Sequence, residues 1–215
     1  ITTGGQNTFI GYLAGTAVTE ASQNTAVGRG ALDAVTTTGQ HTAMGDNALG
    51  ACTSGTNNTA FGSQAAAATT SGASNVAVGA YALDASTTGD SNVAIGLNAL
   101  GAADTSNRNV AIGRHALAAY NPSGNEDSYN VAIGYDALTT GTTGIENTAV
   151  GSKSMLANTT GRNNAAFGAY SLDANTSGEN NTAVGKSALG ANTTVNNNTA
   201  VGLNAADSIT TGISN

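Results

Sequence analysis

Apolar and polar positions recur along this chain with a period of 17 residues. The repeat reads Asn-Thr/Val-Ala-Val/Ile-Gly-x-x-Ala-Leu-x-Ala-x-Thr-Thr/Ser-Gly-x-x, counted from its Asn as position 1. A short, fixed period predicts a solenoid in which each coil packs on its neighbours rather than a globular domain. Position 1 falls at Asn7, Asn24, His41, Asn58, Asn75, Asn92, Asn109, Asn130, Asn147, Asn164, Asn181, Asn198 and Asn215.

Positions 2 to 4 alternate in character, which is typical of a short strand. Position 4 is a large apolar residue in every repeat, such as Ile95, so we expect it to form the core. Position 3, on the opposite face, is almost always Ala. We therefore expect that face to be packed as well, for example against a second subunit. Positions 8 and 9, usually Ala-Leu, predict a second extended segment, and Thr-Thr-Gly predicts the turn to the next coil.

Position 5 is Gly in all twelve repeats, which indicates a positive φ or a close approach of another backbone. These glycines are Gly11, Gly28, Gly45, Gly62, Gly79, Gly96, Gly113, Gly134, Gly151, Gly168, Gly185 and Gly202.

The predicted fold is therefore all-β, a parallel β-solenoid or β-roll. Twelve coils would span residues 7–214, after a partial repeat at 1–6 and before the next repeat, which starts at residue 215. One coil per strand spacing of about 4.8 Å predicts a rod roughly 58 Å long. Both ends of the chain fall in mid-pattern, so we expect a segment of a longer fibre. A helical Ala-Leu segment is the alternative, although helices of about seven residues are marginal.

The Asn column is predicted to be structural, because stacked amides hydrogen-bond along a column or cap turns. The column members that we predict as structural residues are Asn24, Asn58, Asn75, Asn92, Asn109, Asn130 and Asn147. His41 interrupts the column, and we interpret it as a tolerated donor rather than a ligand. Cys52 is the only cysteine, so no internal disulfide is possible, and it is best read as a small apolar filler.

One interval is longer than the others, because Asn130 follows Asn109 by 21 positions instead of 17. The extra residues in 109–129 predict a protruding loop, because solenoids accept insertions at turns. The loop is either a neutral bulge or a contact site for a partner. Its candidate contact residues are Tyr120, Asn121, Pro122, Glu126, Asp127 and Tyr129.

The candidate chemistry of the chain argues against catalysis. The two histidines, His41 and His115, lie about four coils apart, and Asp33, Asp84, Asp173 and Asp207 share position 10 in dispersed coils. We therefore expect no enzyme activity, cofactor or metal site. With a net charge of -7 and scattered basic residues, a nucleic-acid partner is not expected either, and no apolar stretch predicts a membrane span.

Threonine columns at positions 13 and 14 suggest ice binding as a third functional alternative. Adjacent residues of a strand point to opposite faces, however, so the Thr-Thr pair reads better as a turn with local hydroxyl-to-backbone bonds.

The segments Asn-Val-Ala-Ile-Gly at 92–96, 109–113 and 130–134, with Ala three residues after each Gly, resemble the head repeats of YadA-like trimeric autotransporter adhesins, also known as Hep/Hag repeats. The repeats are also similar to those of phage tail fibres. The resemblance implies a left-handed β-roll, a side-by-side homotrimer and a bacterial surface. We expect a structural or adhesive extracellular fibre segment on a cell or virion surface, with copies of itself and a host-surface or glycan ligand as partners.

Overall fold

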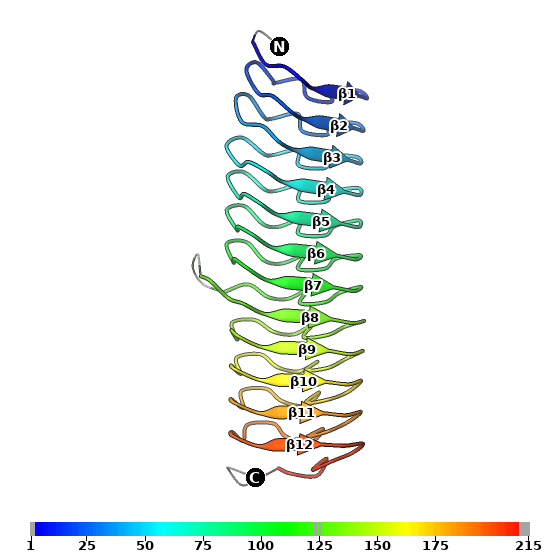
Figure 1. Ribbon diagram of the computed structural model, residues 1–215, viewed down its shortest axis with the longest axis vertical. Coiled ribbons are helices and arrows are strands. Elements are labelled where there is room, and N and C mark those ends of the chain that lie inside the picture. Colours follow the sequence, from blue (N-terminus) through cyan, green and yellow to red (C-terminus); the bar gives the residue numbers. More distant parts are fainter. Residues whose placement is uncertain (1–2, 123, 125, 211–215) are drawn as a thin grey trace.

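Each coil contributes one three-residue strand, and twelve strands form a single parallel sheet in sequence order (Figure 1). The structure, a computed structural model, describes residues 3–122, 124 and 126–210; Asn215 and residues 1–2 of the partial repeat lie outside it. The predicted all-β solenoid is confirmed, with about 11 turns of about 17 residues. The strands are β1 (Thr8–Ile10), β2 (Thr25–Val27), β3 (Thr42–Met44), β4 (Thr59–Phe61), β5 (Val76–Val78), β6 (Val93–Ile95), β7 (Val110–Ile112), β8 (Val131–Ile133), β9 (Thr148–Val150), β10 (Ala165–Phe167), β11 (Thr182–Val184) and β12 (Thr199–Val201).

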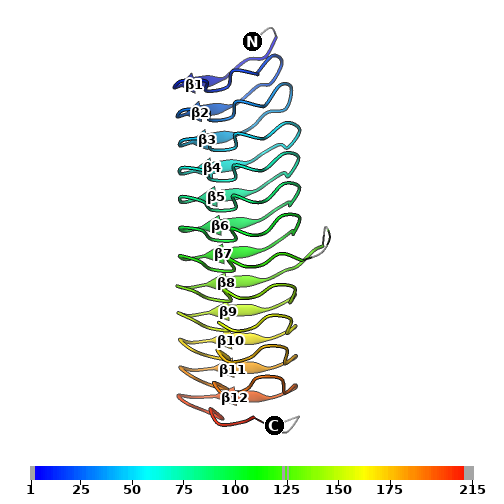
Figure 2. The ribbon, with the colours of Figure 1, turned by 180° about the vertical axis from the view of Figure 1, so that it is seen from behind.

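The register of the sheet is uniform, because every strand residue pairs with its equivalent in the next coil. Val93 pairs with Val110, and Val110 with Val131 across the long interval. The additional residues therefore leave the ladder intact, and the described residues of this insertion lead away from the rod between β7 and β8 (Figures 1 and 2).

The two faces of each strand are reversed from the prediction for position 4. Position 3 faces the interior: Ala94 has no exposed surface. Position 4 faces outward, with Ile10 60% and Phe61 45% exposed. The prediction that position 4 forms the core was wrong, because the inward position of the strand is position 3, where a small residue packs against the side chain of position 9. The core instead combines Ala at positions 3 and 8 with Leu at position 9, as in Leu100.

The first coil demonstrates how tightly this interior is filled. It carries Phe9 where the other coils have Ala and Gly15 where most have Leu. A Cβ placed on Gly15 would lie 2.8 Å from the Phe9 ring, so the two substitutions exchange a large and a small residue across one space. In this coil, positions 3 and 9 therefore lie against each other, and the large Phe9 is accommodated by the missing side chain of Gly15.

The segment after Gly5 of the repeat consists of turns, so the predicted second extended leg was wrong. Positions 7 and 9 adopt the left-handed backbone region, as in Asn98 (φ 55°) and Leu100 (φ 52°). The backbone still bonds to adjacent coils: the Leu100 amide donates to the Ala116 carbonyl at 3.0 Å. No part of the chain that the structure describes is helical, so the helical alternative is not adopted.

The position-5 glycines form a column in which each backbone lies against the next. Gly96 has a φ of 130°, and a Cβ there would lie 2.6 Å from the carbonyl oxygen of Gly113. Both conditions that favour glycine therefore apply at this position.

Candidate interaction surface

The outward side of the sheet, which we call the outer face, consists of positions 2 and 4 of all twelve strands. It carries no charged residue in any of these strands, although the whole chain has a net charge of -7. Its side chains are partly or fully exposed, from the half-buried Ile95 of β6 to Val201 of β12, which is 70% exposed. An apolar strip that follows a whole rod is typical of a surface that another molecule covers.

The middle of the outer face is the most apolar part. In β5 to β8 positions 2 and 4 are all Val or Ile, whereas the strands on either side mostly have Thr or Ala at position 2. We call this set the central stripe: Val76, Val78, Val93, Ile95, Val110, Ile112, Val131 and Ile133.

Large side chains also flank the outer face, at positions 6 and 7. Leu97 is 44% exposed, Tyr81 48%, and Tyr135 44%. The Arg114 guanidinium lies 5.7 Å from the centre of the Tyr135 ring, a cation–π contact between adjacent coils. This margin therefore adds apolar area beside the central stripe.

The predicted contact loop is divided by the structure into buried and exposed residues. Tyr120 is fully buried at position 12, and Pro122 is buried beside it, so neither is available to a partner. Asn121, Glu126, Asp127 and Tyr129 are exposed; of the inserted segment, Ser123 and Asn125 lie outside the described residues. The sequence alone did not distinguish the two tyrosines.

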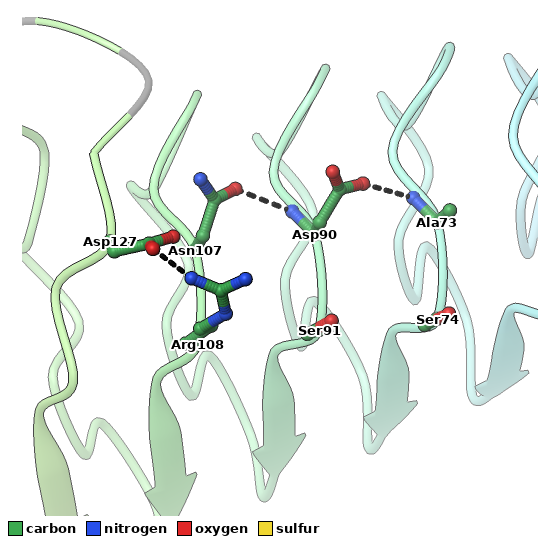
Figure 3. A pocket seen from close by; sticks show the side chains of 7 residues that line it. All are labelled: Ala73, Ser74, Asp90, Ser91, Asn107, Arg108 and Asp127. Carbon is green, nitrogen blue, oxygen red and sulfur yellow. Dashed lines mark hydrogen bonds and ion pairs between the residues drawn. The ribbon is translucent and has the colours of Figure 1, made fainter.

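A shallow polar cavity of about 210 Å³ lies beside this loop (Figure 3). Asp90 and Asn107 extend along the rod and accept hydrogen bonds from the backbone amides of Ala73 (2.7 Å) and Asp90 (2.8 Å) respectively. Arg108 closes one side through an ion pair with Asp127. It also donates to the Tyr129 hydroxyl at 3.1 Å. These polar groups mainly bond one another, so the contacts around the cavity link the loop to the rod.

The position-1 column is a continuous hydrogen-bonded ladder in the interior. Asn92 is fully buried; its Oδ1 accepts from the Asn109 backbone amide at 3.0 Å and its Nδ2 donates to the Ser106 carbonyl at 2.8 Å. The same arrangement recurs at Asn58, Asn75, Asn130, Asn147 and Asn164. Each Asn thus bonds one adjacent coil and also the corner of its own coil, at position 15.

His41 occupies the same place in the ladder and is 1% exposed. Position 12, the corner beside it, is filled by Cys52, whose Sγ lies 3.9 Å from His41 Nε2. Burial raises the pKa of Cys52 to about 11, so this thiol is protonated at neutral pH and is not an activated nucleophile.

The threonines of position 13 also face the backbone of the next coil. Thr70 Oγ1 donates to the Thr87 carbonyl at 3.0 Å, and Thr159 Oγ1 donates to the Thr176 carbonyl at 2.9 Å. These hydroxyl groups therefore donate hydrogen bonds that link successive coils at position 13.

In the part of the chain that the structure describes, the acidic residues of position 10 are not brought together. Burial raises the pKa of Asp84 and of Asp173, but these carboxylates belong to distant coils. Within residues 3–122, 124 and 126–210, no three His, Cys, Asp or Glu side chains are placed to share a metal ion. The described residues also contain no helix with the length and apolar character required to cross a membrane.

Comparisons with protein-family models, with curated proteins and with solved structures found no match. The likeness to YadA-like head repeats therefore stays a prediction. The outer face is the feature of this structure that bears most directly on function.

Proposed function

We propose that this chain is a structural segment of an extracellular fibre in which copies of the rod lie side by side and cover one another's outer faces. The observation that carries this proposal is the uncharged outer face, which has an apolar residue at position 4 of every strand from β1 to β12 and is most apolar in the central stripe. In water such a strip favours association, at about 25 cal/mol for each Å² of apolar surface buried.

The shape of the strip favours a second copy as its partner. The strip is narrow and repeats with the strand spacing of about 4.8 Å, so a partner must be equally long and have the same repeat to contact all of it. Another copy of the chain, aligned in parallel, meets both conditions. Positions 2 and 4 carry no charged residue, so contact between two outer faces would bury no charged side chain of the sheet. The resemblance to trimeric adhesin heads favours three copies.

The test is the assembly state of the unmodified protein and of two lysine variants, measured by sedimentation and native mass. Ile95→Lys places a charge in the central stripe and should weaken association by roughly 100-fold or more, since it removes about 1.5–3 kcal/mol of apolar burial and forces a charge into the contact. Ser71→Lys introduces the same charge at an exposed corner residue away from the sheet and should leave assembly unchanged.

The proposal would be overturned if the unmodified protein sediments as a single rod up to its solubility limit. Equal assembly of the two lysine variants would also contradict the assignment of this face. Circular dichroism of each variant separates loss of assembly from loss of folding.

Adhesion to a host surface or glycan would follow from such a fibre through multivalency, because many weak sites on a stiff rod act together. A phage tail-fibre shaft has the same physical requirements and differs in the structure that carries it. For ice binding through threonine columns, thermal hysteresis of the purified protein is the test. The use of position-13 hydroxyls within the rod favours the fibre instead.

A further inference from the structure

His41 takes over both hydrogen bonds of the asparagine that it replaces. Its Nδ1 lies 3.3 Å from the backbone nitrogen of Asn58, in the place of an Asn Oδ1. Its Nε2 lies 3.1 Å from the carbonyl oxygen of Gly55, in the place of an Asn Nδ2. The imidazole is thus a structural copy of the amide within the ladder.

These partners determine where the imidazole carries its proton. A backbone N–H can only donate, so Nδ1 must be an unprotonated acceptor; a backbone carbonyl can only accept, so Nε2 must carry the hydrogen. The ladder therefore requires the neutral Nε2–H tautomer. An asparagine amide has no corresponding alternative state, because it does not gain a proton in this pH range.

We propose that His41 is an acid-sensitive joint in the rod, at which protonation of Nδ1 breaks the ladder between β3 and β4. A proton on Nδ1 would point at the Asn58 N–H, so two donors would oppose each other and the Asn58 amide would lose its acceptor. Both groups are buried, and a buried polar group without a partner is costly. This inference is independent of the proposed fibre function.

Among the described residues, no charged group acts on the ring that could compensate the charge of an imidazolium. The ring contacts the backbone amide of Asn58, which directly precedes β4, the carbonyl oxygen of Gly55 and the thiol of Cys52. Of these groups only the Cys52 thiol titrates. Because burial raises the pKa of Cys52 to about 11, it stays neutral under the acidic conditions in question.

The direction of the pH effect follows from the burial of the ring, which lowers the pKa of His41 below the value of about 6.5 that histidine has in an unfolded chain. The unfolded segment then binds a proton more readily than the folded one. The contribution of the joint to stability is complete above about pH 6.5 and declines as the pH falls below that value, until the folded group is also protonated. Each pH unit in this window favours opening by about tenfold.

Opening should remain local, because the coils of a solenoid contact only their neighbours. We therefore expect amide hydrogens of β4 and Asn58 to lose protection at low pH, while those of β11 keep theirs. His115 is the natural comparison: its Nδ1 lies 3.3 Å from Asp136 Oδ1 in a partly exposed pair outside the ladder.

The experiment measures hydrogen exchange of the Asn58 and Thr182 amides between about pH 6.5 and about pH 4.5. The ratio of their opening constants cancels the intrinsic effect of pH on exchange. In the unmodified protein this ratio should rise as the pH falls, by at most about 100-fold over this range. In His41→Asn, which restores the residue of the other coils, the ratio should stay constant, whereas His115→Asn should behave like the unmodified protein.

A constant ratio in the unmodified protein would overturn the proposal, as would an equal rise in His41→Asn. The nitrogen chemical shifts of His41 provide a second measurement that needs no variant. They should report the Nε2–H tautomer at neutral pH, and the opposite tautomer would contradict the assigned hydrogen bonds.

Discussion

At the scale of single residues, the rod depends on backbone conformations that most side chains avoid. Position 5 has φ near 130° with a neighbouring backbone in contact, and only Gly meets both conditions. Position 9 has a Leu at φ near 52°, as in Leu100, which is unusual for a bulky residue. The complete burial of Leu100 and its intercoil hydrogen bond offset the strain of this conformation.

Gly96→Ala should therefore destabilise the rod by about 3 kcal/mol or more. About 1–3 kcal/mol comes from the positive φ, and the rest from a Cβ that the Gly113 carbonyl would meet at 2.6 Å. Thermal or denaturant unfolding measures the loss. Gly5→Ala is the matched control, since a Cβ there meets nothing within 4 Å and its φ is ordinary; equal losses in both variants would refute the explanation.

At the scale of the strand, the small inner residue decides which face is which. A three-residue strand has one inward side chain, at position 3, and the facing Leu leaves space only for Ala. The Phe9–Gly15 exchange in the first coil is the exception that demonstrates this limit. The larger positions 2 and 4 are then directed outward, where they form the outer face.

Ala94→Val tests this assignment against the usual preference of strands for valine. The additional methyl groups would overpack the interior, so we expect a loss of about 1–3 kcal/mol. Ile95→Val on the opposite face of the same strand should cost less than about 1 kcal/mol, because that side chain is partly exposed in the single rod. Unfolding of both variants under conditions that keep the rods apart gives the comparison, and the reverse order of losses would show that position 4 is the core after all.

At the scale of the whole molecule, the rod is a one-dimensional stack in which the insertion between β7 and β8 is tolerated without loss of register. The fully buried Tyr120 fills the corner under the loop, and its neighbours in the position-12 column, Ala103 and Gly141, are small. The large side chain at position 12 of this coil is thus accommodated by small residues at position 12 of the two adjacent coils. Burial also raises the pKa of the Tyr120 hydroxyl, so it opposes ionisation in the folded rod.

Tyr120→Ala should cost about 3–5 kcal/mol by leaving a cavity. In a stack with nearest-neighbour contacts the effect should appear as faster hydrogen exchange in β7 and β8 while β1 and β12 are unchanged. Tyr129→Ala is the control, because this tyrosine is 50% exposed and packs on Arg108 outside the core. A uniform increase in exchange along the whole rod would contradict the stack model.

Much of this architecture can be predicted from the sequence. The 17-residue period, the glycine column and the three-residue apolar alternation indicate parallel coils, because equivalent residues of a solenoid must stack. Two faults of the prediction have separate causes. Alternation distinguishes two faces of a strand but does not say which faces inward, so Ile95 was assigned to the core. Propensity does not anticipate a Leu in the left-handed region, so Leu100 was assigned to an extended leg.

The sequence by itself therefore determined the repeat, its strands and the position of the insertion, since periodicity and local alternation carry that information. The tertiary structure decided which face each strand buries, because that depends on the width of the closed coil. It also separated the buried Tyr120 from the exposed Tyr129 and placed His41 between an amide and a carbonyl. Those outcomes depend on contacts between residues that come together only when successive coils stack.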